Sequence, residues 1–266
     1  MNLGKQIRLN RLFAHPSGRL CSVAVDHFMG YQRDLPAGIH RLRATLAAVM
    51  AARPDAVTMH KGVAVGFWGP YAGQVPLIIQ ASLIRPDDSA FEFAATPEDA
   101  LRLGADAFAV AAFVRGDTEA KHLRVVADFV RQAARLEIPL ICHIYPRHMG
   151  PTPSISYEPQ DIAWAVHCAY EIGADVVKVP YCGDVAAHAD IVAECPVPVV
   201  AAGGPKTETQ EAALAMMAEV VRSGARGATI GRNIWGFDHV TASVNAFKAV
   251  IHDGLSAQEA MRHAGL

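Results

Sequence analysis

The sequence predicts an α/β protein whose fold is a (β/α)8 barrel, also called a TIM barrel. Eight short apolar segments recur along the 266 residues, and segments with helical periodicity separate most of them. The length fits as well, because a (β/α)8 barrel typically needs about 250 residues. No linker or low-complexity run interrupts the pattern, so we expect residues 1–266 to form a single barrel domain.

The eight apolar segments resemble parallel strands that are covered on both faces. They are short, and they lack the strict polar alternation of a strand with one face in water. They cover residues 20–27, 55–62, 76–82, 106–113, 139–146, 175–181, 198–205 and 227–233.

Helical periodicity is found in most of the intervals and after the last strand. The segments are 38–52, 96–104, 117–136, 158–173, 207–224, 241–252 and 256–263. Thr207 and Gln210 have the spacing of a capping box, and Gly173 and Gly224 stand where helices stop. The alternative fold, an open doubly wound sheet, would place a glycine-rich turn after its first strand. The segment "VAVDHFMGYQ" has no such turn, which favours the barrel.

Composition narrows the class of protein. The formal net charge of −2 gives no general attraction to nucleic acid or to an anionic membrane. No apolar run reaches the length of about 18 residues that a membrane-spanning helix needs, and the first residues lack the apolar core of a signal peptide. The five cysteines form no CxxC pair, which is typical of reduced thiols in a cytoplasmic protein.

Polar residues gather at the carboxyl ends of the predicted strands, where barrel enzymes place their chemistry. They are Asp26, His27, His60, Lys61, Gln80, Ser82, His143, Tyr145, Lys178 and Tyr181, followed by the glycine-rich turns after the last two strands.

Lys178 lies within the apolar stretch "GADVVKVPYCGD". A lysine that attacks a carbonyl must be neutral, and at a pKa near 10.4 only about one molecule in 2,500 is neutral at pH 7. If desolvation and nearby cations lowered the pKa by about 3, roughly a quarter would be neutral. Lys206 could supply such a charge. The alternative is a lysine that extends out of the strand end into solvent.

Two glycine-rich turns follow the seventh and eighth predicted strands. Barrel enzymes frequently bind phosphate there, with backbone N–H groups and a short extra helix, here expected at 233–238. The turns contain Gly203, Gly204, Lys206, Gly231 and Arg232. Gly-Pro can also mark a simple turn.

Proton transfer and metal binding give competing interpretations of the other polar residues. Tyr145 and Asp26 could move protons during aldol chemistry, although a tyrosine can also close the barrel end and an aspartate can cap a turn. His27, His60 and His143 could instead hold a divalent metal in a metal-dependent aldolase or hydrolase. Lone strand histidines are more often hydrogen-bonded pocket residues.

The motifs "GKQIRLNRLF", "SGRLCSVAVDH", "HKG", "YPR", "GADVVKVPYCGD", "CPVPVVAAGGPKT" and "GRNIW" span nearly the whole chain. In these motifs the sequence resembles the archaeal-type class I fructose-bisphosphate aldolases of the DeoC/LacD superfamily. That superfamily also contains 2-amino-3,7-dideoxy-D-threo-hept-6-ulosonate synthases and autoinducer-2 phosphate thiolases.

The resemblance implies a barrel aldolase that forms a covalent imine on Lys178 and uses no metal or other cofactor. It implies that Tyr145 is the acid/base residue and that Asp26 assists proton transfer. His143, which is not part of the family pattern, is a third candidate for a catalytic base beside Tyr145. The turns after strands seven and eight would bind the phosphate of a sugar phosphate. His27 and Lys61 are further candidates for substrate binding, and a homo-oligomer of five or ten subunits is implied.

The sequence departs from the family pattern at the expected far end of the substrate. Phe28 follows the Asp-His pair where the family commonly has glycine, His143 replaces a Trp or Met, and "YPRG" becomes "YPRHMGP". Fructose bisphosphate itself is therefore not assured as the substrate. A related transaldolase or thiolase reaction, or a barrel that binds a sugar phosphate without catalysis, stays open.

Overall fold

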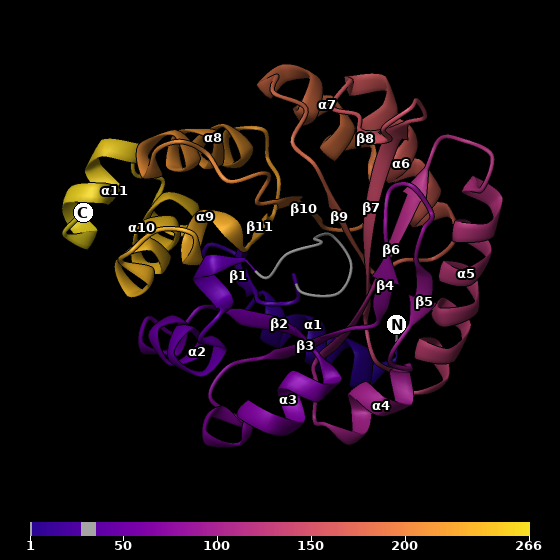
Figure 1. Ribbon diagram of the computed structural model, residues 1–266, viewed down its shortest axis with the longest axis horizontal. Helices are drawn as coiled ribbons and strands as arrows, with labels where there is room; N and C mark the ends of the chain where they lie inside the picture. Colours follow the sequence, from indigo (N-terminus) through magenta and orange to yellow (C-terminus); the bar gives the residue numbers. More distant parts are fainter. Residues whose placement is uncertain (1, 28–35) are drawn as a thin grey trace.

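The computed structural model describes residues 2–27 and 36–266 and shows a closed (β/α)8 barrel (Figure 1). Phe28, one of the positions at which the sequence departs from the family pattern, lies outside the described residues. The barrel strands are β1 (Leu20–Ala24), β2 (Ala56–His60), β3 (Leu77–Gln80), β6 (Ala107–Val114), β7 (Leu140–His148), β9 (Val176–Val179), β10 (Val199–Ala202) and β11 (Gly227–Ile230).

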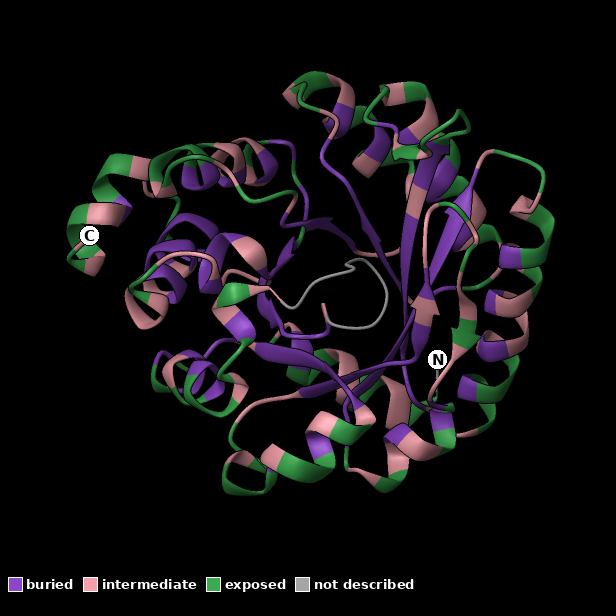
Figure 2. Ribbon diagram, in the orientation of Figure 1, coloured by how far each residue is buried: buried purple, intermediate pink, exposed green. Residues whose placement is uncertain are grey.

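Every neighbouring pair in the barrel is parallel, and pairing of β6 with β7 closes the ring. The open-sheet alternative is therefore wrong, and each of the eight predicted segments overlaps a barrel strand, although β6 and β7 continue past the predicted ends. Figure 2 shows the strands as an almost wholly buried ring and the exposed positions on the outer sides of the helices.

The helices surround the barrel, and the longest of them is α5. They are α2 (Leu42–Ala51), α3 (Lys61–Phe67), α4 (Pro97–Arg102), α5 (Glu119–Arg135), α6 (Pro159–Glu171), α7 (Val185–Glu194), α8 (Gln210–Arg222), α9 (Arg232–Trp235), α10 (Val240–Asp253) and α11 (Ala257–Ala264). Short 3-10 turns occupy Ala37–Ile39 and Gly69–Tyr71.

One predicted helix start is wrong. The side chain of Thr209, not Thr207, accepts the N–H of Ala212 and caps α8. The helix begins only at Gln210, so Thr207 lies before it, and its hydroxyl donates to the carbonyl of Thr209. Gly173 and Gly224 have the expected left-handed conformation after α6 and α8, with φ of 96° and 83°.

The helix α1 (Leu3–Leu12), which the sequence analysis did not predict, covers the amino-terminal end of the barrel. Its two ion pairs reach residues that stand just before strands: Lys5 to Asp175 at 2.9 Å and Arg11 to Asp106 at 3.1 Å. Leu12 completes a small apolar cluster inside the barrel with Leu20, Ala56, Ile78, Ala107, Ala109, Ile141, Val176 and Val200. The alternate strand residues, such as Val57 and Ile79, pack against the helices.

Two small strand pairs rise above the barrel rim. Strand β4 (Ser82–Ile84) forms a hairpin with β5 (Phe91–Phe93), and β8 (Ser154–Ile155) pairs antiparallel with the end of β7. Both lie in segments that connect a barrel strand to the helix after it. They therefore give these rim segments backbone pairing of their own.

His188 on α7 is fully buried, and neither ring nitrogen has a hydrogen-bond partner among the residues that the structure describes. Burial lowers its pKa to about 4. The unfolded chain therefore binds a proton below about pH 6.5 that the folded protein takes up only near pH 4, so folding stability falls across that window.

We expect His188→Leu to reduce this acid sensitivity. At pH 5 the wild-type protein should have lost about 2 kcal/mol of stability through this residue, relative to pH 7.5. Urea unfolding of both proteins at the two pH values measures the loss of unfolding free energy in each. The contributions of the other histidines cancel in the comparison, because both proteins carry them. An equal loss in the two proteins would contradict the assignment.

Candidate active site

A cavity of about 230 Å³ opens at the carboxyl ends of the barrel strands. Nine predicted site residues line it: Asp26, His27, His143, Tyr145, Lys178, Gly203, Gly204, Gly231 and Arg232. The sequence analysis assigned no role to its other lining residues, which include Pro86, Ile155, Tyr157, Pro180, Pro205 and Thr229. Its size is below the usual range for drug-sized ligands, which fits a small metabolite.

Strand periodicity explains why these side chains meet. Successive residues of a strand alternate between the two faces, so Val176 and Lys178 share the interior face of β9, as Ile141, His143 and Tyr145 do on β7. In the pairing of these two strands, His143 is the direct partner of Lys178. The barrel interior is therefore apolar toward the amino-terminal ends of the strands and polar toward their carboxyl ends.

Lys178 is 6% exposed and lies at the top of the interior, between the histidine of one neighbouring strand and Val200 of the other. The valines on either side of it face outward into the helical layer. The side chain of Lys178 therefore ends in the cavity and does not extend into solvent beyond the strand end.

Asp26 and His27 lie across the cavity at the end of β1. Burial alone would raise the pKa of the Asp26 carboxyl, but its electrostatic interactions with His27 and then Lys178 hold that pKa below its usual value. Burial lowers the pKa of His27 to about 4, against the opposing effect of Asp26. At neutral pH the site therefore holds an aspartate anion beside a neutral histidine, whose Nδ1 lies 3.4 Å from Asp26 Oδ1.

A hydrogen-bonded series joins the interior faces of β2, β3 and β7. The two ring nitrogens of His60 lie 3.0 Å from the carbonyl of Gln80 and 3.2 Å from that of Asp26. The side-chain oxygen of Gln80 accepts the N–H of Ser82, so its amide nitrogen faces His143 Nδ1 at 3.0 Å. The imidazole of His143 therefore accepts at Nδ1 and carries its proton on Nε2.

This series does not fit the hypothesis of a three-histidine metal site. Both nitrogens of His60 face carbonyl groups, and Nδ1 of His143 faces an amide, so these lone pairs are not directed at a shared point. Within residues 2–27 and 36–266, no group of three or more histidine, cysteine or acidic side chains is arranged to hold a metal ion.

The turns after β10 and β11 are held together by Asn233 at the start of α9. Its amide donates to the carbonyls of Gly203 at 2.7 Å and Pro205 at 2.9 Å, and its oxygen accepts the N–H of Thr207 at 2.9 Å. Arg232 donates to the carbonyl of Gly204 at 3.1 Å. These contacts fix the backbone of both turns along the cavity wall.

Glycine is required at two of these positions. A Cβ on Gly203 would lie 2.8 Å from the backbone of Ile230, and Gly204 has a φ of 71°. The short helix expected at 233–238 begins one residue earlier and is shorter, at Arg232–Trp235.

Two predicted binding residues lie outside the cavity lining. The ammonium of Lys61 lies 3.1 Å from the carboxylate of Asp99, and that of Lys206 lies 4.1 Å from the centre of the Phe237 ring. Lys206 therefore does not bring its charge to the imine position, as the sequence analysis had considered. Both lysines follow strand ends, but the side chains turn toward neighbouring helices and loops.

Tyr157 is a pocket residue that the sequence analysis did not single out. It is 42% exposed and stands between β8 and α6, next to the fully buried Ser156, whose hydroxyl donates to Asp161 at 2.7 Å. Burial raises the pKa of Tyr157, while the Arg232 charge opposes this, so the two side chains lie within electrostatic range. Only its position in a long loop after a strand could have suggested it.

No helix in the described part of the chain is long and apolar enough to cross a membrane.

Comparison with known proteins connects this geometry to a group of enzymes. The sequence model of the family described as DeoC/LacD family aldolase matches residues 20–236. A 2-amino-4,5-dihydroxy-6-oxo-7-(phosphonooxy)heptanoate synthase of Streptomyces griseus is 32% identical over 98% of this chain and 95% of its own. A 3-hydroxy-5-phosphonooxypentane-2,4-dione thiolase of Enterobacter sp. (strain 638) is 30% identical over 98% of this chain and 86% of its own.

Among solved structures, an archaeal fructose-1,6-bisphosphate aldolase superposes with a TM-score of 0.82. It is 26% identical and the match covers 93% of this chain and 99% of that chain. In that structure the catalytic lysine is covalently bound to the carbinolamine intermediate of the substrate.

Proposed function

Because this chain belongs to the DeoC/LacD aldolase family, we propose that it is a Schiff-base aldolase whose substrate is a small ketone with a phosphate on the adjacent carbon. The observation that supports this most is the arrangement of Lys178 in one cavity with the fixed turns at Gly203 and Arg232. A lysine can attack a ketone while a phosphate one carbon away rests on the turns.

The names of the relatives agree with this substrate class. The 6-oxo-7-phosphonooxy group of the heptanoate, the phosphonooxy-ketone of the pentanedione and the first two carbons of fructose 1,6-bisphosphate all place a ketone beside a phosphate-bearing carbon. This shared unit is the part of the substrate that the imine and the phosphate site would hold.

The reaction then proceeds through the residues of the cavity. The neutral amine of Lys178 attacks the ketone carbon, and loss of water gives an iminium ion. A base removes the proton of the hydroxyl two carbons from the iminium carbon, and the carbon–carbon bond electrons move to the iminium nitrogen. An aldehyde leaves and an enamine remains on the lysine. Protonation of the enamine carbon and hydrolysis by water release the second product.

We propose that Tyr145 carries these protons and that Asp26 orients the hydroxyls of the substrate. His143 is less suited to the proton transfer. Burial and then the charge of Lys178 lower its pKa well below the ordinary value, and its Nδ1 is occupied by Gln80. The phenol of Tyr145, which lines the cavity on the same strand face, is the better proton carrier.

Borohydride reduction tests this function. With dihydroxyacetone phosphate as the probe, we expect a stable adduct on Lys178, located by mass spectrometry of peptides. The same treatment without the ketone should leave the protein mass unchanged. No adduct on Lys178 of the folded enzyme, with this probe or with longer ketose phosphates, would contradict the Schiff-base mechanism.

We also propose that the enzyme is a cytoplasmic homo-oligomer of five or ten subunits, as the family resemblance implies. The free cysteines, two of them buried, are consistent with a reducing compartment. Light scattering of the purified protein measures the subunit number directly.

A further inference from the structure

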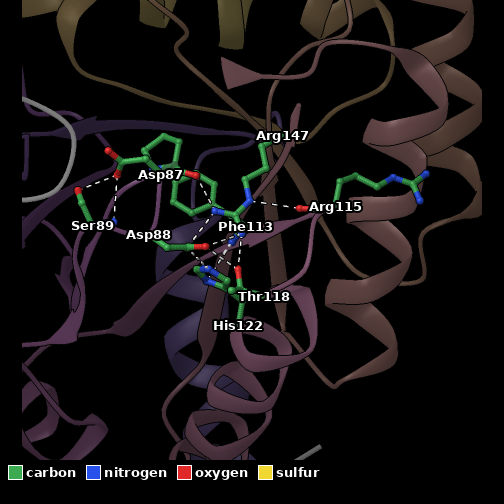
Figure 3. Close-up of polar contacts among 9 residues, drawn as sticks. Asp87, Asp88, Ser89, Phe113, Arg115, Thr118, His122 and Arg147 are labelled. Carbon is green, nitrogen blue, oxygen red and sulfur yellow. Dashed lines mark hydrogen bonds and ion pairs between the residues drawn. The ribbon is translucent and has the colours of Figure 1, made fainter. Parts of the chain in front are cut away.

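Arg147, near the end of β7, is a fully buried arginine whose guanidinium is bonded on every side (Figure 3). It forms two parallel bonds to the Asp88 carboxylate, at 2.9 and 3.0 Å. It also donates to the carbonyls of Pro86 at 2.6 Å and Arg115 at 3.2 Å, and to the hydroxyl of Thr118. Such a buried bidentate pair has a single geometry and holds its partners rigidly.

Asp88 lies in the turn between β4 and β5, where its backbone has the left-handed φ of 57°. Besides Arg147, its carboxylate accepts from Thr118 at 2.7 Å and lies 3.0 Å from His122 Nε2. Burial would raise the pKa of this carboxyl, but the bond to Arg147 and its other partners hold the pKa well below the usual range. The hairpin turn is thus attached to β7 and to α5 by one anion.

Arg147 is connected to three parts of the cavity wall. Its guanidinium holds the carbonyl of Pro86, and its backbone pairs with Ile155 in the β7–β8 register. Both partners line the cavity. The third part is Tyr145, two residues earlier on the same strand, whose ring lies 6.0 Å from that of Phe113. The guanidinium of Arg147 lies 5.4 Å from the same Phe113 ring.

The residues of this wall belong to the segment from β4 to β8. Lys178 and the two glycine-rich turns belong to β9 and to the ends of β10 and β11, on the other side of the cavity. A ketose bound by its imine and first phosphate would therefore extend its remaining carbons toward Pro86 and Ile155. These are the carbons that leave as the aldehyde.

We propose that Arg147 is a positioning residue that fixes this wall and so determines how the enzyme binds the aldehyde-forming part of its substrate. The inference rests on the proposed function. It predicts that loss of the Arg147–Asp88 pair weakens binding of long ketose phosphates and leaves the three-carbon ketone unaffected.

The test uses borohydride trapping at Lys178 with two probes, dihydroxyacetone phosphate and fructose 1,6-bisphosphate. The concentration of each probe that gives half-maximal adduct is measured by mass spectrometry. For Arg147→Met we expect this concentration to rise about tenfold for fructose 1,6-bisphosphate and to stay within about twofold for dihydroxyacetone phosphate. Arg147→Lys keeps the charge but cannot form both bonds to Asp88, so it should fall between Arg147→Met and the wild type.

Asp88→Asn is the second variant, because it keeps the shape of the turn if Arg147→Met does not fold; it should show the same difference between the probes. Lys5→Met is the matched control, since it removes a partly buried ion pair at the opposite end of the barrel, and neither probe should change. Equal changes for both probes, or none in folded Arg147→Lys and Asp88→Asn, would overturn the proposal. If the wild type traps neither probe, the proposed function itself fails.

Discussion

Replacing Lys178 by methionine is expected to lower kcat by about 10⁴-fold or more, to the background of the uncatalysed reaction. Without the amine no iminium forms, and the electrons of the breaking carbon–carbon bond have no acceptor. The structure should tolerate the change, because methionine has a similar length and an apolar side chain suits a position that is already buried in the barrel interior beside Val200. A normal unfolding transition together with lost activity is therefore the expected result.

The measurement is steady-state turnover, combined with borohydride trapping of the same preparation. Lys248→Met is the matched control: its ammonium donates to the carbonyls of Ala52 and Arg53 at 3.0 Å, far from the cavity, and the variant should keep wild-type kcat. An active Lys178→Met enzyme would show that the lysine serves only to bind the substrate.

Replacing Tyr145 by phenylalanine is expected to lower kcat by about 10²- to 10⁴-fold, the usual contribution of a positioned acid/base group. Phenylalanine retains the packing of the ring against Phe113, so the loss should come from the hydroxyl. Because the proton moves at the enamine carbon, exchange of a carbon-bound proton of dihydroxyacetone phosphate with deuterated water should slow by a similar factor. Trapping at Lys178 should still be detectable.

Tyr170→Phe provides the comparison, because it removes an exposed hydroxyl on α6 that lies 2.6 Å from His167 Nδ1. His143→Gln examines the rival proton carrier and should slow exchange less than Tyr145→Phe. If His143→Gln were the more damaging of the two, the proton would have to pass through the imidazole, and the assignment to the tyrosine would be wrong.

The barrel could be predicted from sequence because its strands are short apolar runs buried on both faces, a pattern that depends on local residues. The three helices that were not predicted have weak local signals. Helix α3 contains two glycines, α7 is largely apolar and so lacks a clear polar face, and α1 is mostly polar along its length. Each is stabilised by packing on the barrel, which no periodicity reveals.

The site was predictable to the extent that barrel strands bring their carboxyl ends together. That rule places Asp26, Tyr145, Lys178 and the two glycine-rich turns in one cavity, as the structure shows. It does not state which way a long side chain turns after its strand ends, so Lys61 and Lys206 were included although they lie elsewhere. It also could not find Arg147, whose partners come from loops 29 to 61 residues away in sequence.

The helix at the amino-terminal end of the barrel has a consequence for how the chain folds. Lys5 and its partner Asp175 are separated by 170 residues, a length that a ribosome takes roughly 10–30 s to synthesise. Strand β1 likewise pairs with β11, the last barrel strand to be made. The apolar side of α1 therefore has no docking surface during most of synthesis, and contacts of such high sequence separation slow folding. Emergence of β11 from the ribosome, rather than emergence of the first strands, is expected to be the point at which the barrel can close.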